Sequence, residues 1–179
     1  TALPFAMTQL GLEKIHHWRV YLPSTITGLI IMVPLIIVGE TRNKLKQVFI
    51  LGIVCIAAAQ IGLLFGMHSV WLITAYLIVY FIGFNVLEAS LPSMVSKIAP
   101  SDLKGTAMGV YNTMQSVGLF VGGATGGLLF QKYGFAGVFA FCSVLMLLWL
   151  VLAVISPAPK PVKNLSYPLN AEWQQNPDL

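Results

Sequence analysis

Five long runs of hydrophobic residues alternate with short polar segments along the chain. Each run holds about 20 residues, which is the length that an α-helix needs to cross a bilayer core of about 30 Å. Hydrophobic and polar positions do not alternate residue by residue within the runs, so they predict helices and not strands. The predicted spans are Val20–Val38, Val48–Met67, Val70–Leu91, Thr106–Phe130 and Phe135–Ile155.

A shorter apolar stretch, residues 1–12, precedes the first run. At about 1.5 Å per residue, it would reach only part of the way across a bilayer. It lacks the basic start and the small-residue cleavage site of a signal peptide. We interpret it as the end of a preceding helix. We therefore expect a transmembrane half-domain over residues 1–157 and a proline-rich cytoplasmic tail over residues 158–179.

The composition agrees with a chain that lies in a bilayer. Hydrophobic residues make up 57% of the sequence, charged residues make up 9%, and the mean hydropathy is +0.82. Soluble domains carry about 25% charged residues. The sequence therefore indicates an integral membrane protein.

The distribution of basic residues predicts the orientation of the chain. When successive connections are assigned to alternate sides of the membrane, one side receives more Lys and Arg than the other. Cytoplasmic loops carry such an excess, so the C-terminus is expected in the cytoplasm. The formal charge of +4 then reflects topology and anionic lipid headgroups, and it does not indicate nucleic-acid binding. The cytoplasmic set is Arg42, Lys44, Lys46, Lys97, Lys104, Lys160 and Lys163, and the external set is Lys14, Arg19 and Lys132.

The sequence offers no candidate metal or cofactor site. Cys55 and Cys142 each lie inside an apolar run without metal-ligand spacing, and the adjacent side chains of His16 and His17 are expected to diverge. The sequence has no phosphate-binding loop, no Ser-His-Asp set and no HExxH motif. We therefore expect neither an enzyme nor ATP-driven transport by this chain, and we expect no metal or cofactor.

The fourth run carries polar side chains on one face of its predicted helix. Tyr111, Asn112 and Gln115, together with Met108 and Leu119, follow the spacing i, i+3, i+4, i+7 and i+11. The inner half of this helix is therefore expected to present a mixed polar stripe.

Glycines continue the same face outward. Gly118, Gly122 and Gly126 recur at every fourth position, within about 60° of Gln115 at 100° per residue. Small residues at this spacing let helices approach closely in lipid. Two interpretations are open. The face is used only for packing, or the helix lines a path through the protein with its inner half and seals that path with its outer half. The polar stripe favours the second.

Glu88 is a lone acid at the end of the third apolar run. A charged carboxylate at the centre of a bilayer costs about 2.5 to 3.5 kcal/mol on insertion scales, so such an acid is expected near an interface or facing a polar interior. Tyr80, Phe84 and Asn85 share its helix face. An aromatic and polar face of this kind suits an amphipathic cation, through cation–π contact and through charge.

Two interpretations of Glu88 are open. In the first, its carboxylate loses a proton when a cation binds and regains one when the cation leaves. In the second, Glu88 only pairs with a basic or amide group at the cytoplasmic rim, and Lys97 and Lys104 are the candidate lysines.

Pro34 interrupts the first apolar run. Its missing N–H frees a carbonyl one turn back, and a bend is the usual result. Because prolines are frequent in membrane helices, Pro34 is either a tolerated residue or a bend that takes part in gating.

Motifs in the sequence resemble those of a known family. The segment GLFVGGATGG resembles the GxxxGPxxGG signature of the drug:proton antiporter branch of the major facilitator superfamily, where Gly123 replaces the proline and Gly126 and Gly127 match the final pair. The segment GETRNKLKQ resembles the basic GxxxDRxGRR loop of that family. Its Asn43 and Lys44 stand where the family has Asp and Arg, and Gly39 matches the first glycine.

Two further segments extend the resemblance. SKIAPSDLKGTAMG is similar to the family's inner loop between helices ten and eleven, with Lys104 and Gly105 matching its basic-Gly pair. FNVLEASLPSMVSKIAP resembles the corresponding segment of YajR-type transporters within the branch.

The resemblance implies an all-α membrane protein, the C-terminal six-helix half of a twelve-helix transporter from the end of helix seven to helix twelve. It also implies proton-coupled efflux of drug-like or other small molecules by alternating access, in the inner membrane, with a separate N-terminal six-helix half as partner. Two alternatives are a sugar or metabolite importer of the same superfamily and a non-transporting membrane scaffold. The expected path for substrate and protons is lined by Tyr80, Phe84, Asn85, Glu88, Tyr111, Asn112 and Gln115.

Overall fold

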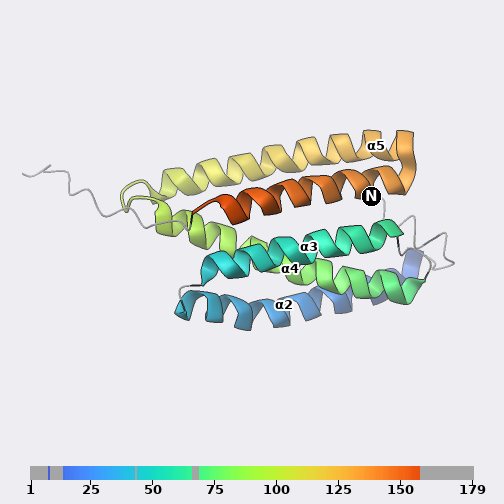
Figure 1. Cartoon of the computed structure of the whole chain (residues 1–179), viewed down its shortest axis with the longest axis horizontal. Coiled ribbons are helices and arrows are strands. Elements are labelled where there is room, and N and C mark those ends of the chain that lie inside the picture. The colour runs from blue at the N-terminus through green and yellow to red at the C-terminus, as the bar shows by residue number, and fades with distance from the viewer. Residues whose placement is uncertain (1–7, 9–13, 43, 66–68, 158–179) are drawn as a thin grey trace, which may run out of the picture.

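The computed structural model describes residues 8, 14–42, 44–65 and 69–157 as a set of long, roughly aligned helices (Figure 1). A short 3-10 turn, η1 (Lys14–His16), comes first. It is followed by α2 (Trp18–Thr41), α3 (Leu45–Phe65), α4 (Val70–Ile98) and α5 (Lys104–Ile155).

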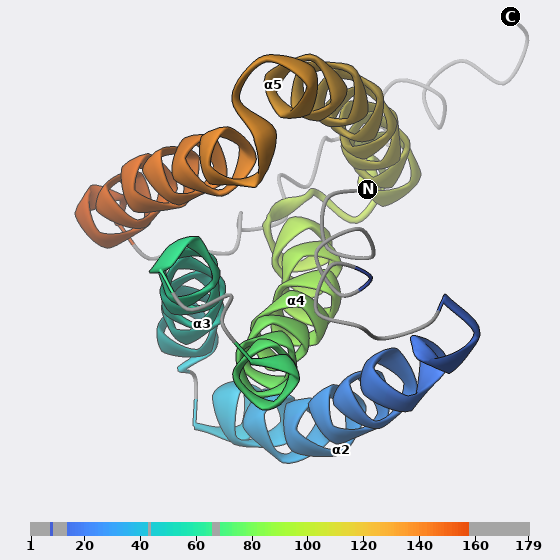
Figure 2. The ribbon, with the colours of Figure 1, turned by 90° about the vertical axis from the view of Figure 1, so that its right-hand side faces the viewer.

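The helix α5 is two helices joined at one glycine. Gly134 has φ 63° and ψ −152°, a backbone conformation that is open almost only to glycine. The chain reverses there, so the first arm of α5 (residues 104–133) and its second arm (residues 135–155) run side by side in opposite directions (Figures 1 and 2).

The five predicted spans are confirmed as helices. The helices α2, α3 and α4 and the combined α5 are each long and apolar enough to cross a membrane, and α5 holds the fourth and fifth predicted spans. The prediction ended the third span at Leu91, whereas α4 continues to Ile98 through Pro92, because one missing N–H does not stop a helix. The predicted stub over residues 1–12, with the exception of Thr8, lies outside the described residues, as do Asn43, Met67 and the tail over 158–179.

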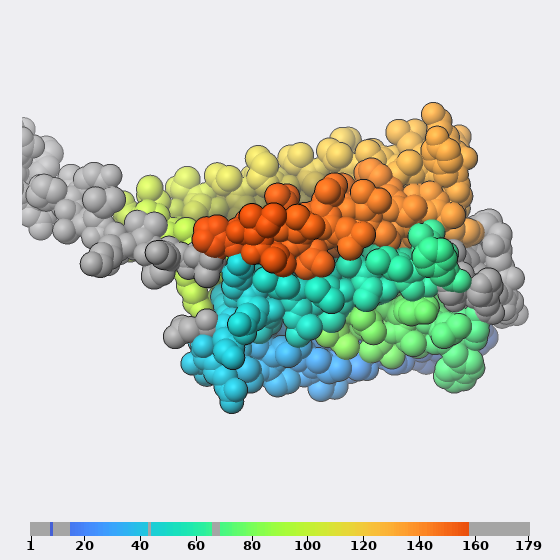
Figure 3. Space-filling view, viewed as in Figure 1, coloured from blue at the N-terminus to red at the C-terminus, as the bar shows by residue number. Residues whose placement is uncertain are grey.

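The core of the described bundle is centred on α4 and α3. The helix α4 packs against α2 and α3, and α5 packs mainly against α3, with its second arm lying along that helix (Figure 3). Two buried clusters hold these helices together. One is formed by Val20, Leu63, Ile73, Leu77 and Phe139, and the other by Phe49, Ile53, Ile56, Leu87 and Ala153.

Glycines set the closest helix contacts. A Cβ added at Gly83 on α4 would lie 2.6 Å from the carbonyl oxygen of Gly52 on α3. A Cβ added at Gly28 on α2 would lie 2.9 Å from the carbonyl oxygen of Phe81 on α4. Close packing of bare backbone is the main source of helix association in lipid, so these two crossings hold α4 against both neighbours.

The first arm of α5 contributes nothing to this core. The buried residues of α5 are Phe139, Ser143 and Ala153, all on the second arm. Large apolar side chains of the first arm are exposed, among them Leu119 at 80% and Phe120 at 78%. The first arm therefore lies at the edge of the bundle and offers its apolar faces to lipid or to another protein segment.

Polar contacts tie the helices at one end of the bundle. Glu40 near the end of α2 accepts hydrogen bonds from Ser93 at 2.8 Å and from Lys97 at 3.0 Å, both on α4. Lys46 at the start of α3 donates to the backbone carbonyls of Val154, at 3.3 Å, and Ser156, where α5 ends. The last carbonyls of a helix carry partial negative charge, so a lysine is a favourable partner for them.

Candidate functional site

The centre of the candidate site is a contact between Glu88 on α4 and Gln115 on the first arm of α5. The side-chain amide Nε2 of Gln115 lies 3.2 Å from Oε1 and 3.3 Å from Oε2 of Glu88. Both side chains are exposed to the space beside the helices. Two residues that the sequence predicted for the path, on separate helices, are thus brought together.

The contact leaves the charge of Glu88 in place. Gln115 is neutral, and in this contact its amide Nε2 donates to the carboxylate. Lys97 bonds to Glu40 instead, and no lysine or arginine of the described residues forms an ion pair with Glu88. Lys97 and Lys104 are therefore not its partners, and an amide partner agrees with both open interpretations of Glu88.

The backbone adds a second polar group at the same position. Pro92 follows Glu88 by four residues inside α4 and has no N–H to donate to the Glu88 carbonyl. The backbone carbonyl of Glu88 therefore lacks its normal helical hydrogen bond. Sequence reasoning missed this feature, although the spacing of Glu88 and Pro92 was sufficient to find it.

An aromatic ridge leads to Glu88 along α4. Tyr80, Phe84 and Glu88 are spaced by four residues, so they follow one another on the helix surface. The rings of Tyr80 and Phe84 are stacked, with centroids 6.1 Å apart and an interplanar angle of 10°. Phe84 is 42% exposed. This ridge can offer aromatic faces to a cation that approaches the carboxylate.

Asn85 is placed differently from the ridge. Its amide nitrogen donates to the carbonyl of Phe81 at 2.8 Å, and a Cβ added at Gly28 on α2 would lie 2.8 Å from that nitrogen. Asn85 is therefore part of the crossing between α2 and α4. The sequence pattern predicts that it lines the path, and in the structure its amide lies beside Gly28.

Tyr111 and Asn112 lie one turn before Gln115 on the first arm. Tyr111 is half-buried and Asn112 is exposed, and the backbone carbonyl of Asn112 accepts a hydrogen bond from Ser116 at 3.0 Å. Within the described chain, no side-chain hydrogen bond joins either residue to Glu88, so they extend the polar stripe without completing the central contact.

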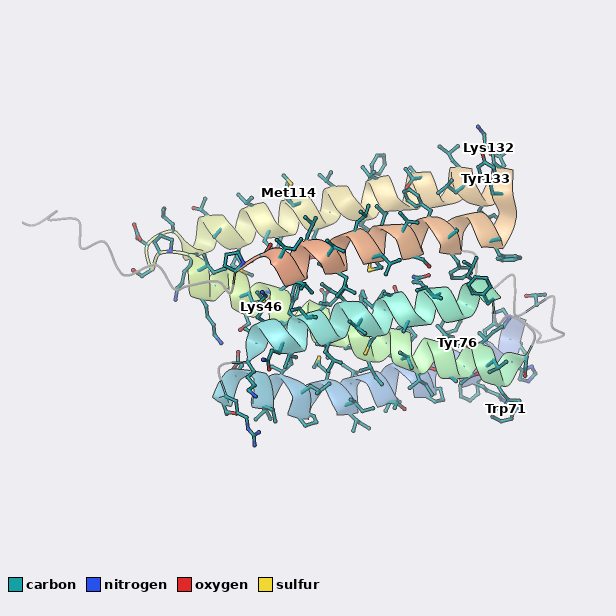
Figure 4. All side chains as sticks on the ribbon, viewed as in Figure 1. Lys46, Trp71, Tyr76, Met114, Lys132 and Tyr133 are labelled. Carbon is teal, nitrogen blue, oxygen red and sulfur yellow. The ribbon has the colours of Figure 1, made fainter. Side chains whose placement is uncertain are left out.

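The predicted packing glycines of the first arm face open space. A Cβ added at any of them would meet nothing within 4 Å in the described chain, whereas Gly52 and Gly83, which sequence reasoning did not single out, are in close contact. Met114 on the same arm points away from the bundle (Figure 4). The open glycines are Gly118, Gly122, Gly123, Gly126 and Gly127.

Apart from Gly39, which is buried, the described loop residues and Pro34 lie at the surface. Gly39 is buried at the end of α2, and its carbonyl accepts a hydrogen bond from the backbone N–H of Lys44 at 2.7 Å. Lys104 and Gly105 begin α5 and are exposed. Pro34 is exposed, and α2 continues as a helix on both sides of it.

Within the described ranges, no group of three or more His, Cys, Asp or Glu side chains is arranged to hold a metal ion. The groups that the structure places at the Glu88 site are one carboxylate, one amide and aromatic rings.

Comparison with known proteins identifies what the chain resembles. The sequence model of the Major Facilitator Superfamily matches residues 1–175. The inner membrane transport protein YajR of Escherichia coli is 35% identical over 178 residues, which cover 99% of this chain and 39% of that protein. These matches confirm the resemblance to the superfamily and to YajR-type transporters.

Two further relatives are also described as transporters. An uncharacterised transporter of Buchnera aphidicola is 30% identical over 84% of this chain and 40% of its own length. An uncharacterised MFS-type transporter of Methanocaldococcus jannaschii is 26% identical over 59% of this chain and 28% of its own length. The chain thus spans about two fifths or less of these curated relatives. No solved structure matches it.

Proposed function

The chain belongs to the major facilitator superfamily, and from this membership we propose that it is the C-terminal six-helix half of a twelve-helix secondary transporter. In this proposal α2, α3 and α4 are helices eight, nine and ten, and the two arms of α5 are helices eleven and twelve. A second helical half, from the same or another polypeptide, completes the assembled transporter. We propose that this transporter exports drug-like or other small molecules in exchange for protons.

The contact between Glu88 and Gln115 is the observation that carries the proposal. It joins the only acid within the α4 span to a polar stripe on a helix that is otherwise exposed and apolar. A carboxylate within an apolar span is costly, and intramembrane acids commonly mark ion and substrate paths. The amide orients the carboxylate without neutralising it, so the charge stays available.

The proposed mechanism follows from the fact that a single carboxylate can bind a proton or a cation, but not both at once. Glu88 binds either a proton or a cationic group of the substrate, because a protonated carboxyl has lost the charge that attracts a cation. Tyr80 and Phe84 supply aromatic faces beside it. Substrate binding on the inner side therefore displaces the proton, and proton binding from the outside displaces the substrate. The two ligands compete for one site, which is the requirement for exchange.

In this proposal the first arm of α5 forms the wall of the substrate path that moves. A Cβ added at any of its glycines would meet nothing within 4 Å in the described chain, so this face is available to a helix of the second half. We propose that this contact seals the path on the outer side while the polar stripe at Gln115 lines it on the inner side. Residues 1–179 alone then bind a substrate without gating a path.

The proposal includes the position of the chain in the cell. The apolar helices and the membrane relatives support an integral membrane protein, and we propose the bacterial inner membrane with the C-terminus in the cytoplasm. The end of the bundle that carries Arg42, Lys44 and Lys46 then faces the cytoplasm.

Proton movement in everted membrane vesicles tests the function. Vesicles that contain the assembled transporter are energised to acidify the lumen, and a lipophilic cation such as tetraphenylphosphonium is added. Antiport predicts that the lumen becomes more alkaline. Further acidification would indicate a symporter that works as an importer, and no proton movement with any substrate would indicate a scaffold. Vesicles with residues 1–179 alone are the matched control, and substrate-dependent proton flux in them would contradict the need for a second half.

A further inference from the structure

A groove of about 310 Å³ lies at the basic end of the bundle, apart from the Glu88 site. It is formed where α3 begins, near the end of α4 and where α5 ends. Its lining includes Phe49 on α3, Met94 on α4, and Trp149 and Leu152 on the second arm of α5, with Lys46 as its one charged residue. The proposed path does not use this groove, although Lys46 belongs to the basic segment over residues 39–47.

Lys46 brings an unbalanced charge to the groove. Its ammonium donates to the carbonyls of Val154 and Ser156, which are neutral oxygens with only partial negative charge. An ammonium has three N–H groups, so one is left for a further acceptor. In the part of the chain that the structure describes, Lys46 forms no ion pair with a carboxylate.

The remaining walls are apolar and aromatic. The rings of Phe49 and Trp149 meet edge to face, with centroids 5.7 Å apart and an interplanar angle of 82°. Leu152 is 63% exposed, so the wall is open to the surroundings of the bundle. Trp149 also carries an indole N–H, a donor of the kind that is common at the level of lipid headgroups.

The groove thus combines a cation with an apolar wall at one end of the membrane-crossing helices. Lys46 is the second residue of α3, so it lies where an apolar span meets the headgroup layer. Arg42 and Lys44 add positive charge at the same end. An occupant that satisfies both parts has a negatively charged head and a hydrocarbon body.

We propose that this groove binds an anionic phospholipid from the leaflet that faces it. The lipid phosphate lies against the free N–H of Lys46, and an acyl chain runs along Phe49, Trp149 and Leu152. A free phosphate ion would leave the apolar wall uncovered, and a zwitterionic lipid has no net charge to balance Lys46. The bound lipid joins the start of α3 to the end of α5.

Lipid retention measured by native mass spectrometry tests this proposal. The assembled transporter is extracted in mild detergent and titrated with phosphatidylglycerol or with phosphatidylcholine of the same acyl chains. Phosphatidylglycerol is expected to be retained preferentially. In Lys46→Gln, which keeps a side-chain N–H for the α5 carbonyls but removes the charge, the preference is expected to fall about fivefold, as for the loss of one basic residue near an anionic surface. Lys46→Arg is expected to keep it.

Control variants distinguish lipid binding in the groove from a general effect of the positive charge at this end of the bundle. Lys44→Gln removes a charge at the same end outside the groove lining and is expected to keep the preference. Leu152→Gln makes the wall polar and is expected to lower retention of both lipids. Thermal unfolding of each variant, at the same detergent concentration, shows whether it is folded.

Three results would overturn the proposal. The first is a folded Lys46→Gln protein that retains phosphatidylglycerol as the parent does. The second is displacement of the lipid by millimolar inorganic phosphate, which would indicate a site for the headgroup alone. The third is a parent protein that retains no phosphatidylglycerol until residues 158–179 are deleted, which would indicate that the chain's own C-terminal segment fills the groove.

Discussion

Gln115 holds both oxygens of the Glu88 carboxylate with one amide nitrogen, at 3.2 Å and 3.3 Å. The contact crosses from the first arm of α5 to α4, whose other contacts with α5 are few. A hydrogen bond to a charged group contributes about 1.5 to 3 kcal/mol. This hydrogen bond therefore links the first arm of α5 to α4 through two side chains.

The first prediction replaces Glu88 by Gln in the assembled transporter. Gln has the shape of a protonated Glu and keeps an oxygen for the Gln115 amide, so folding should be preserved. Affinity for a lipophilic cation should fall about tenfold, the equivalent of about 1.4 kcal/mol. The loss should be largest at high pH, where the parent carboxylate is charged, and transport by the variant should depend little on pH.

Cation binding and transport, each measured across a range of pH, check this prediction. Glu40→Gln is the control, because Glu40 bonds to Ser93 and Lys97 at the end of the bundle and not to the path. A Glu88→Gln protein with the parent's pH profile and cation affinity would reduce Glu88 to a surface residue.

The second prediction concerns the crossing of α3 and α4. In Gly83→Ala the added Cβ would lie 2.6 Å from the carbonyl oxygen of Gly52, so the helices must separate. Overpacking of this kind costs about 1 to 3 kcal/mol. Thermal unfolding in detergent should show a lower midpoint. Gly109→Ala is the matched control, because a Cβ there meets nothing within 4 Å and should not lower stability. Equal midpoints for the two variants would contradict the close contact.

The third prediction concerns the reversal of α5. Gly134 has φ 63° and ψ −152°, and a residue with a side chain in that region costs about 1 to 3 kcal/mol. Gly134→Ala should therefore be destabilised by this amount in chemical or thermal unfolding. Gly127→Ala, at an open helical position of the same arm, should not be. A Gly134→Ala protein as stable as the parent would mean that the turn adopts another conformation.

The fourth prediction concerns the open glycine face. Gly122→Leu adds a side chain where the described chain has open space, so residues 1–179 alone should keep their stability. In the assembled transporter the same change overpacks the proposed contact with the second half, at about 1 to 3 kcal/mol. Transport should become leaky or biased towards the inward-facing state, while substrate binding is largely kept.

Transport rates and the reactivity of externally accessible thiols measure the effect of Gly122→Leu. Val121→Leu is the control, since it enlarges the adjacent side chain without filling a glycine position. If Gly122→Leu changes neither transport nor thiol reactivity, the glycine face contacts lipid and not a second half.

The fifth prediction concerns Pro34. Its side chain is exposed and α2 runs through it, so the structure favours the interpretation of a tolerated proline. Pro34→Ala restores an N–H for the carbonyl of Ile30 and should leave the turnover rate unchanged. A changed turnover rate with an unchanged amount of folded protein would identify a bend that takes part in gating.

The sequence predicts the spans well because the thickness of the bilayer sets the length of an apolar run. It also names Glu88 and Gln115, since a polar side chain in such a run is conspicuous. Their contact could not be predicted, because the distance between two helices depends on the packing of all the others. For the same reason the sequence does not predict that Asn85 lies against Gly28.

The helix crossings were harder to predict for a physical reason. In a membrane the buried and the lipid-facing sides of a helix are both apolar, so hydrophobic periodicity does not identify the packed face. Gly52 and Gly83 are single glycines in uniform apolar runs, whereas the conspicuous glycine repeat on the first arm of α5 has no partner in the described chain. Charges at the helix ends are equally ambiguous, and Lys97 proved to bond to Glu40.

The reversal at Gly134 also constrains how the protein is made. The first arm is about 45 Å long and the second about 31 Å, at 1.5 Å per residue, and no loop separates them. The polar segment between the two apolar arms is limited to Gln131, Lys132 and Tyr133, at the far end of the first arm. With so short a polar segment, we expect the two arms to enter the bilayer together as one hairpin.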